Sequence, residues 1–184
     1  MKVLVFGGAF DPPHMGHLIV ADWIREEMNI ERVLFIPYFR NKDKIPVASP
    51  KDRLTMISLA IEGWDGFVLD DVEIRRGGIS YTIDTVEELL TRGIGEIYWI
   101  IGEDSVDSLT SWKEWEKLIK LVKFVVAPRW GEKGSKKDYL IYSNAPRIEI
   151  SSSLIRERIK AGKSVRFLLP EQVWAYIEEK RLYR

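Results

Sequence analysis

Short apolar runs alternate along the chain with longer segments in which apolar residues recur every three or four positions. The apolar runs cover residues 3–6, 33–36, 67–69, 97–101 and 124–127. They are nearly continuous rather than alternating, which is typical of strands that are buried on both faces. We therefore expect these runs to be strands of a parallel sheet.

The longer segments have the period of amphipathic helices. Residues that would share one face of a helix are Met15, Leu18, Ile19 and Trp23, then Leu54, Ile57 and Ile61, then Ile83, Val86 and Leu90. Ser49 and Pro50 predict a capped helix start, Pro170 predicts the start of another helix, and Gly162 predicts the end of the helix before it. Alternating strands and helices predict an α/β fold: a Rossmann-like, doubly wound parallel sheet with helices on both faces.

The composition restricts the class of protein. With 184 residues, of which 46% are hydrophobic and 30% charged, residues 1–184 are expected to form one globular domain. Lys and Arg total 28 and so do Asp and Glu, and this zero net charge argues against a nucleic-acid partner. The absence of cysteine excludes disulfides, thiol nucleophiles and cysteine-based metal sites. No apolar run is long enough to cross a membrane or to act as a signal peptide, so we expect a cytoplasmic protein without a membrane partner.

The first expected strand is followed by a segment that suits an anion. Gly7 and Gly8 allow a ligand to approach the backbone. The only two histidines of the chain, His14 and His17, lie where a helix should begin. Free backbone N–H groups and two imidazoles together predict a polyphosphate site. The segment lacks the Gly-Lys-Ser/Thr ending of a P-loop and the glycine spacing of a dinucleotide fingerprint. A tight turn with packed histidines is the structural alternative, and a metal site that includes Asp11 is a weaker one.

A second candidate phosphate site lies at residues 150–158. It follows a strand-like run at 148–150, with three serines at 151–153 where a helix should start and Arg156 about one turn into that helix. Hydroxyls and N–H groups at a helix start can hold a phosphate, with the arginine fork beside them. A plain capped helix with a solvated arginine is the alternative. The lysine-rich segment 131–138 is predicted to be a surface loop.

These two motifs resemble those of the HxGH nucleotidyltransferases. Gly-Gly-x-Phe-Asp-Pro-x-His-x-Gly-His at residues 7–17 and Ile-Ser-Ser-x-x-Ile-Arg at residues 150–156 carry the resemblance. The chain is similar in particular to the bacterial nicotinate-nucleotide adenylyltransferases. Four further segments look like that branch, fall in its order and extend the likeness over essentially the whole chain: 77–82, 101–105, 112–115 and 176–183.

The resemblance implies an activity. The family transfers AMP from ATP to nicotinate mononucleotide, which gives nicotinate adenine dinucleotide and pyrophosphate in NAD biosynthesis. The 5′-phosphate attacks the α-phosphorus of ATP without a covalent enzyme intermediate. The expected cofactor is Mg²⁺ on the ATP phosphates, with no metal ligand from the protein. The expected partners are ATP and nicotinate mononucleotide, and the sequence leaves the oligomeric state open, a homo-oligomer included.

The resemblance also implies residue roles. His14, His17 and Arg156 would be catalytic. The ATP-binding residues would be Gly7, Gly8, Phe10, His14, His17, Gly102, Asp104, Ser152 and Arg156. Of these, Ser152 and Arg156 would hold the departing phosphates, and Gly102 and Asp104 would lie at the ribose. Tyr81, Thr82 and Trp112 would form the pyridine-nucleotide site, with Trp112 stacked on the ring.

Some of these assignments have structural alternatives. Trp112 shares a helical spacing with Trp115 and Ile119, so it could belong to a core stripe, and Tyr81 and Thr82 could merely begin a helix. Segment 38–46 lacks the histidine and basic pair of the family, and either Lys42 or Lys44 could bind phosphate instead. Ala9 stands where the family usually has threonine, Ser153 replaces the threonine of the second motif, and segment 129–148 is short.

Three other functions compete with this prediction. Pantetheine-phosphate adenylyltransferase shares the phosphate motifs, but segments 80–82 and 112–115 argue against it. A non-catalytic regulator on the same fold would bind ATP without releasing pyrophosphate. A nucleic-acid-binding protein would need a basic face.

Overall fold

The computed structural model describes residues 1–42, 44–129 and 136–184. In this part of the chain, six parallel strands form one sheet in the order β3-β2-β1-β4-β5-β6. Their bounds are β1 Lys2–Gly8, β2 Arg32–Pro37, β3 Phe67–Leu69, β4 Glu96–Gly102, β5 Val122–Ala127 and β6 Ile141–Tyr142. The order reverses between β1 and β4, as in a doubly wound sheet, so the predicted α/β class is confirmed.

All five predicted strands are present, and the sheet adds one that the pattern did not indicate. The prediction of a strand-like run at 148–150 is wrong, because these residues lie outside every strand. The edge of β5 is already occupied by β6, whose Ile141 pairs with Val125, so the later segment finds no strand partner there. Its isoleucines instead line a cavity.

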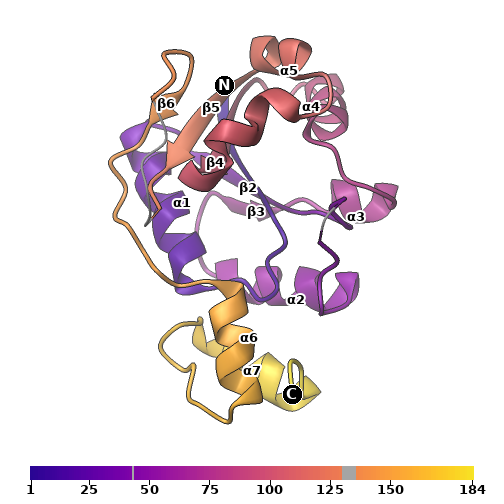
Figure 1. The fold of residues 1–184 in the computed structure, drawn as a ribbon, viewed down its shortest axis with the longest axis vertical. Coiled ribbons are helices and arrows are strands. Elements are labelled where there is room, and N and C mark those ends of the chain that lie inside the picture. The colour runs from indigo at the N-terminus through magenta and orange to yellow at the C-terminus, as the bar shows by residue number, and fades with distance from the viewer. Residues whose placement is uncertain (43, 130–135) are drawn as a thin grey trace.

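Helices connect the strands (Figure 1). They are α1 Met15–Glu27, α2 Pro50–Ile61, α3 Val72–Arg76, α4 Thr82–Thr91, the 3₁₀ helix η1 Glu103–Ser111, α5 Trp115–Leu121, α6 Ser152–Lys160 and α7 Glu171–Lys180. The predicted helix boundaries are confirmed: Ser49 caps α2 by accepting the N–H of Asp52 at 3.1 Å, and Pro170 stands just before α7. Gly162 follows α6 with a φ of 64°, which a left-handed helix end requires.

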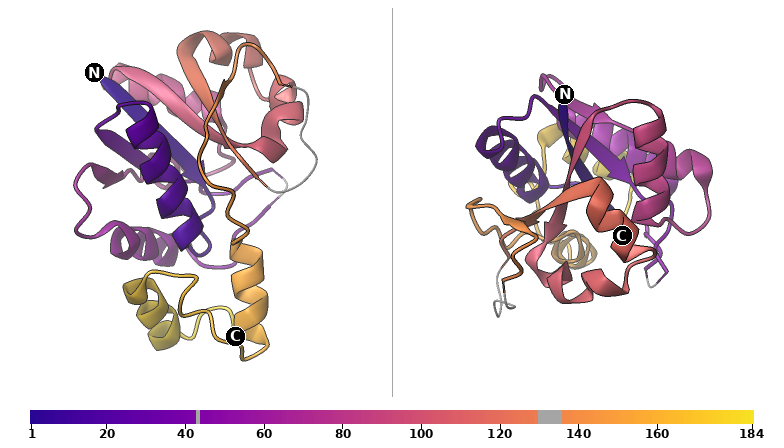
Figure 2. Two further views of the ribbon diagram at one scale, coloured as in Figure 1. Left: turned by 90° about the vertical axis from the view of Figure 1, so that its left-hand side faces the viewer. Right: turned by 90° about the horizontal axis from the view of Figure 1, so that it is seen from above.

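Two apolar clusters cover the two faces of the sheet. On one face, α1 and α2 cover side chains such as Leu4 and Phe35, and apolar residues of α6 and α7 continue the same cluster, with α7 next to α2. On the other face, α4, η1 and α5 pack against side chains such as Val5 and Trp99. Figures 1 and 2 show α6 and α7 beyond the end of the sheet at which β1 finishes. The second phosphate motif therefore lies next to the first.

The predicted apolar faces of two helices are partly wrong. Ile19 and Trp23 of α1 are exposed, whereas Leu18 is buried as predicted, together with Ala21 and Ile24. Trp23 lies at the surface because its indole N–H donates to Asn144 Oδ1 at 2.7 Å, a partner that lies outside the core. In α4, Leu90 is exposed and Leu89 is buried in its place.

Candidate active site

A cavity opens where β1, β4 and β5 end, at the point where the strand order reverses. Its lining residues are Phe6, His14, Gly16, His17, Val20, Ile100, Gly102, Ala127, Pro128, Arg129, Ile148 and Ile150. Ligands of open α/β sheets bind in this crevice. Both histidines and one of the glycines predicted from the sequence therefore line one cavity.

The glycines at the end of β1 make room for close packing. A Cβ atom on Gly7 would lie 2.9 Å from the Trp99 ring, and one on Gly8 would lie 3.2 Å from the Phe10 ring. Phe10 itself is buried in the left-handed region, with a φ of 50°. Its ring packs edge-on against His17, with the ring centroids 5.0 Å apart. The loop thus carries the backbone of Gly7 and Gly8 close to the histidines.

The two histidines form one unit at the start of α1. Their rings stack, with centroids 3.6 Å apart. The backbone N–H of His14, which precedes the helix, donates to Nδ1 of His17 at 3.1 Å. Because that ring nitrogen accepts a hydrogen bond, the neutral His17 ring carries its proton on Nε2. His17 can therefore donate from Nε2 to an anion.

Both histidines are neutral at ordinary pH. Burial, together with the smaller effect of the positive charge of Arg129, lowers the pKa of His14 to about 3. Burial also lowers the pKa of His17 well below its usual value, and His14 and Arg129 add to the effect. Each ring consequently offers a single N–H to a ligand.

We expect the histidines not to titrate near neutral pH. The chain has only two histidines, so its proton NMR spectrum contains two imidazole C2–H signals. The chemical shift of neither signal should change between pH 8 and pH 5. In the unfolded chain the histidine pKa is about 6.5, so the folded state binds fewer protons below that pH. The free energy of unfolding is therefore at its full value above pH 6.5 as far as the two histidines are concerned, and it declines as the pH falls below 6.5.

The size of this loss can be measured by urea unfolding. Each neutral histidine should reduce the free energy of unfolding by about 1.4 kcal/mol per pH unit below pH 6.5. The variant with His14→Gln and His17→Gln should show a smaller decline between pH 7 and pH 5. Histidine signals with midpoints near pH 6.5 would contradict the buried, neutral state.

The second motif docks directly on the first. Ser152 Oγ donates to the carbonyl of Pro12 at 2.8 Å, and Arg156 Nη1 donates to the carbonyl of Asp11 at 2.7 Å. Ser151 caps α6 by accepting the N–H of Leu154 at 3.1 Å. The two motifs singled out in distant parts of the sequence are therefore in direct contact. Arg156 is partly buried there and retains N–H groups for an anion.

Gly102 and Asp104 lie on the other side of the cavity, at the end of β4. A Cβ atom on Gly102 would lie 2.2 Å from Asp104 Oδ1, so the exposed Asp104 carboxylate lies directly over the Gly102 backbone. Arg129 Nε lies 3.7 Å from the same oxygen and also lines the cavity. The sequence reasoning missed Arg129, although its position two residues after β5 is a usable signal.

The predicted pyridine-nucleotide residues lie apart from the histidines, on the second face of the sheet. Tyr81 precedes α4, and Thr82 is its first residue. Trp112 packs edge-on against Phe124 with ring centroids 6.1 Å apart, and Lys113 Nζ lies 4.8 Å from the centre of the Tyr81 ring. Segment 112–113 therefore neighbours the start of α4. Trp112 is only partly buried, as is Trp115, which packs against the same ring.

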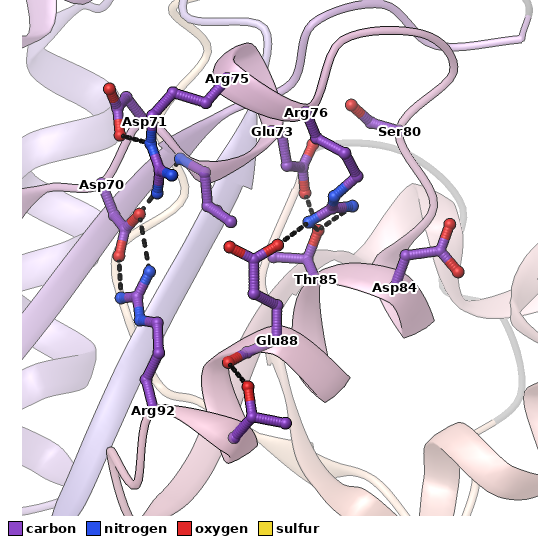
Figure 3. Close-up of polar contacts among 12 residues, drawn as sticks. Asp70, Asp71, Glu73, Arg75, Arg76, Ser80, Asp84, Thr85, Glu88 and Arg92 are labelled. Carbon is purple, nitrogen blue, oxygen red and sulfur yellow. Dashed lines mark hydrogen bonds and ion pairs between the residues drawn. The ribbon is translucent and has the colours of Figure 1, made fainter.

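The α3 helix and the following turn hold the start of α4 in place (Figure 3). Thr85 Oγ1 donates to the buried carboxylate of Glu73 at 2.6 Å, and burial raises the pKa of Glu73. Arg76 donates to Thr85 and pairs with Glu88 at 3.2 Å. Ser80 Oγ accepts the N–H of Phe39 at 3.1 Å, which links this turn to the segment after β2.

A buried arginine that the sequence reasoning missed ties two loops together. Arg53 of α2 is fully buried. Its Nη1 donates to the carbonyl of Ala9 at 2.9 Å, and its Nη2 donates to the carbonyl of Phe39 at 3.2 Å. The loop after β1 and the segment after β2 are therefore fastened to the same guanidinium.

Other predictions are left without a test. Lys42 and Lys44 are both exposed, and the choice between them stays a prediction. Residues 131–135 of the predicted surface loop 131–138 lie outside the described residues. Among the described residues no group of three His, Cys, Asp or Glu side chains could hold a metal ion, and Mg²⁺ on ATP stays a prediction. The described helices include none long and apolar enough to span a bilayer.

Comparison with known proteins identifies the relatives of this chain. The cytidylyltransferase-like family matches residues 5–158. A Geobacillus kaustophilus protein named "Probable nicotinate-nucleotide adenylyltransferase" is 40% identical and covers 99% of this chain and 86% of its own. A protein of the same name from Streptococcus mutans is 38% identical, with 100% of this chain and 89% of its own covered.

Solved structures share the fold. The Plasmodium falciparum nicotinic acid mononucleotide adenylyltransferase in complex with NaAD superposes with a TM-score of 0.83 at 21% identity, covering 99% of this chain and 97% of its own. The same enzyme in complex with APC gives a TM-score of 0.77 at 20% identity, covering 99% and 96%. At this identity the likeness concerns the fold, whereas the bacterial relatives match in sequence over nearly their whole length. This chain therefore belongs to the family of nicotinate-nucleotide adenylyltransferases.

Proposed function

We propose that this protein transfers AMP from ATP to nicotinate mononucleotide, forming nicotinate adenine dinucleotide and pyrophosphate in NAD biosynthesis. The observation that carries the proposal is the docking of Ser152 and Arg156 on the loop that presents His14 and His17. This arrangement gathers neutral and cationic donors around one helix N-terminus, which suits a polyphosphate. The names of the bacterial relatives and the NaAD bound in the Plasmodium enzyme support the choice of substrates.

The reaction is a single displacement at phosphorus. An oxygen of the mononucleotide phosphate forms a bond to the α-phosphorus of ATP, and the bond from that phosphorus to the bridging oxygen of the β-phosphate breaks. The electron pair leaves with pyrophosphate, so negative charge grows on the departing group. Mg²⁺ bound to the phosphates would neutralise part of that charge. The protein contributes position and hydrogen-bond donors rather than a covalent intermediate.

Each predicted residue has a place in this proposal. His17 donates to the ATP phosphates from Nε2, and His14 donates to them from the single N–H of its neutral ring. Ser152 and Arg156 receive the β- and γ-phosphates as pyrophosphate forms. The backbone of Gly7, Gly8 and Phe10 lines the path of the phosphates, and Gly102 and Asp104 lie at the ribose. Tyr81, Thr82 and Trp112 contact the pyridine nucleotide.

The remaining parts of the proposal concern the setting. The substrates ATP and nicotinate mononucleotide are small and water-soluble, so the reaction needs neither nucleic acid nor a membrane, and we place it in the cytoplasm. Residues 1–184 act as one nucleotidyltransferase domain. A homo-oligomer is compatible with this activity.

The proposal is tested by measuring pyrophosphate release from ATP and Mg²⁺ with three acceptors in parallel: nicotinate mononucleotide, nicotinamide mononucleotide and phosphopantetheine. Fast release with the first alone is the expected result. Comparable rates with the first two would retain the reaction and make the enzyme dual-specific. Release with phosphopantetheine alone would overturn the assignment of the acceptor. ATP binding without release for any acceptor would favour a regulator.

Trp112→Ala is expected to raise the KM for nicotinate mononucleotide by roughly fivefold, because an aromatic contact with the ring contributes on the order of 1 kcal/mol. The KM for ATP should be unchanged. Trp115→Ala is the matched control, since Trp115 packs on the same Phe124 ring. If Trp112→Ala lowers only the melting temperature, as the control should, then Trp112 belongs to the core and not to the substrate site.

A further inference from the structure

Asp11 is the most connected side chain of the phosphate loop. Its buried carboxylate accepts three hydrogen bonds: from the Val47 N–H at 2.7 Å, the Ala48 N–H at 3.0 Å and the Tyr183 hydroxyl at 2.8 Å. Arg156 Nη1 lies 3.7 Å from Asp11 Oδ2, which is an ion-pair distance but is too long for a hydrogen bond. One carboxylate thus joins the first motif, the segment before α2, the second motif and the segment after α7.

Tyr183 reaches Asp11 from far along the chain. It follows α7, lies in the left-handed region with a φ of 65°, and is buried. Its hydroxyl shares Asp11 Oδ1 with the Ala48 N–H, so it is one of two donors to that oxygen. Burial and the negative charge of Asp11 raise the pKa of Tyr183, which keeps the hydroxyl protonated and donating.

The geometry of Arg156 depends on this arrangement. Nη1 donates to the Asp11 carbonyl at 2.7 Å and Nη2 donates to Ser153 Oγ at 3.3 Å. The guanidinium has five N–H groups, so three are left for other partners. Without the tyrosine donor, Asp11 Oδ1 would keep only the hydrogen bond from Ala48, and the carboxylate would be less restrained from rotating. Such a rotation would bring Oδ2, which faces Arg156 Nη1 at 3.7 Å, within hydrogen-bond distance of the guanidinium. A closer Asp11–Arg156 pair would withdraw N–H groups and charge from a bound anion.

We propose that Tyr183 is a positioning residue of the phosphate site. Its hydroxyl holds the Asp11 carboxylate away from Arg156, so that Arg156 stays available for the pyrophosphate portion of ATP. The inference rests on the proposed function for its substrate, since the anion that Arg156 receives is the departing pyrophosphate. The alternative is that Tyr183 only anchors the segment after α7 by packing.

Tyr183→Phe separates these two roles, because it keeps the buried ring and removes only the hydroxyl. We expect the kcat/KM for ATP to fall by about tenfold, the KM for nicotinate mononucleotide to stay within about twofold, and inhibition by added pyrophosphate to weaken by a similar factor to kcat/KM. Tyr176→Phe is the matched control. It removes an α7 hydroxyl that donates to Asp52 Oδ1 at 2.8 Å rather than to Asp11, and it should leave these constants unchanged.

A double-mutant cycle tests whether the effect passes through Arg156. Combined with Arg156→Lys, Tyr183→Phe should have little further effect on the kcat/KM for ATP. Wild-type ATP and pyrophosphate constants in Tyr183→Phe, with only a lower melting temperature, would overturn the proposal. If the effects of Tyr183→Phe and Arg156→Lys on the kcat/KM for ATP are additive, then Tyr183 does not act through Arg156.

The proposed function can fail separately from this inference. If the wild-type protein releases no pyrophosphate with any acceptor, the function is wrong. The dissociation constant of ATP with Mg²⁺, measured by calorimetry, then takes the place of the kinetic constants. Weaker ATP binding in Tyr183→Phe but not in Tyr176→Phe would still support the positioning role, and equal binding in both would overturn it.

Discussion

His17→Ala should lower the kcat by roughly two to three orders of magnitude while the fold persists. The neutral ring donates from Nε2 into the cavity, because Nδ1 already accepts the His14 N–H at 3.1 Å. The loss of one preorganised donor to developing charge costs about 3 kcal/mol of the barrier. Pyrophosphate release under saturating substrates measures the effect, and circular dichroism checks the fold.

Two conservative variants of His17 test separately its role as acceptor at Nδ1 and its role as donor at Nε2. Asparagine can place an oxygen where Nδ1 accepts the His14 N–H, but it has no distal donor. Glutamine can place an N–H near the position of Nε2. We therefore expect His17→Asn to be as inactive as His17→Ala, and His17→Gln to retain more activity than either. Near-normal turnover in His17→Ala would remove His17 from the catalytic residues.

Arg53→Ala is expected to lower the free energy of unfolding by about 3 to 5 kcal/mol, a large part of the stability of an ordinary domain. The guanidinium is fully buried and donates to the carbonyls of Ala9 and Phe39. Alanine leaves both carbonyls without these donors and opens a cavity, and each loss is costly in a core. The change is measured by urea unfolding monitored by tryptophan fluorescence.

Arg75→Ala is the control for this prediction. Arg75 of α3 pairs with Asp71 at the surface, so its removal should leave the unfolding midpoint unchanged. Arg53→Lys should fall between wild type and Arg53→Ala, since one ammonium cannot reproduce the arginine fork. A wild-type midpoint for Arg53→Ala would mean that the two loops hold their positions without the guanidinium.

The strands were predictable because the information that specifies them is local. A strand buried on both faces must be apolar at nearly every position, and the five predicted runs are apolar throughout, although Val68 of the edge strand β3 is exposed. The two-residue strand β6 has no such signature, because it exists only through its pairing with β5. The run at 148–150 has Glu149 between its two isoleucines, and the edge of β5 is already occupied by β6. Pairing of this kind depends on the whole sheet and leaves no mark in a short segment.

The residues of the candidate site also differ in whether a local sequence pattern predicts them. His14 and His17 could be predicted because a rare residue pair follows a glycine turn and precedes a helix, all within eleven positions. Arg53 could not, because the helical pattern assigns a charged residue to solvent, and its two acceptors are backbone carbonyls on other loops. The role of Tyr183 likewise depends on one contact with Asp11, which no periodicity reveals.

The contact between Asp11 and Tyr183 also has a consequence for how the molecule is made. The two residues are separated by 172 positions. At roughly 5 to 20 residues per second, a ribosome needs on the order of 10 to 30 s to travel from one codon to the other. Throughout that interval the nascent chain carries both histidines but lacks the phenol that completes the Asp11 network. The nucleotide site is therefore one of the last parts of the protein to mature, although its best-marked residues are among the first to be synthesised.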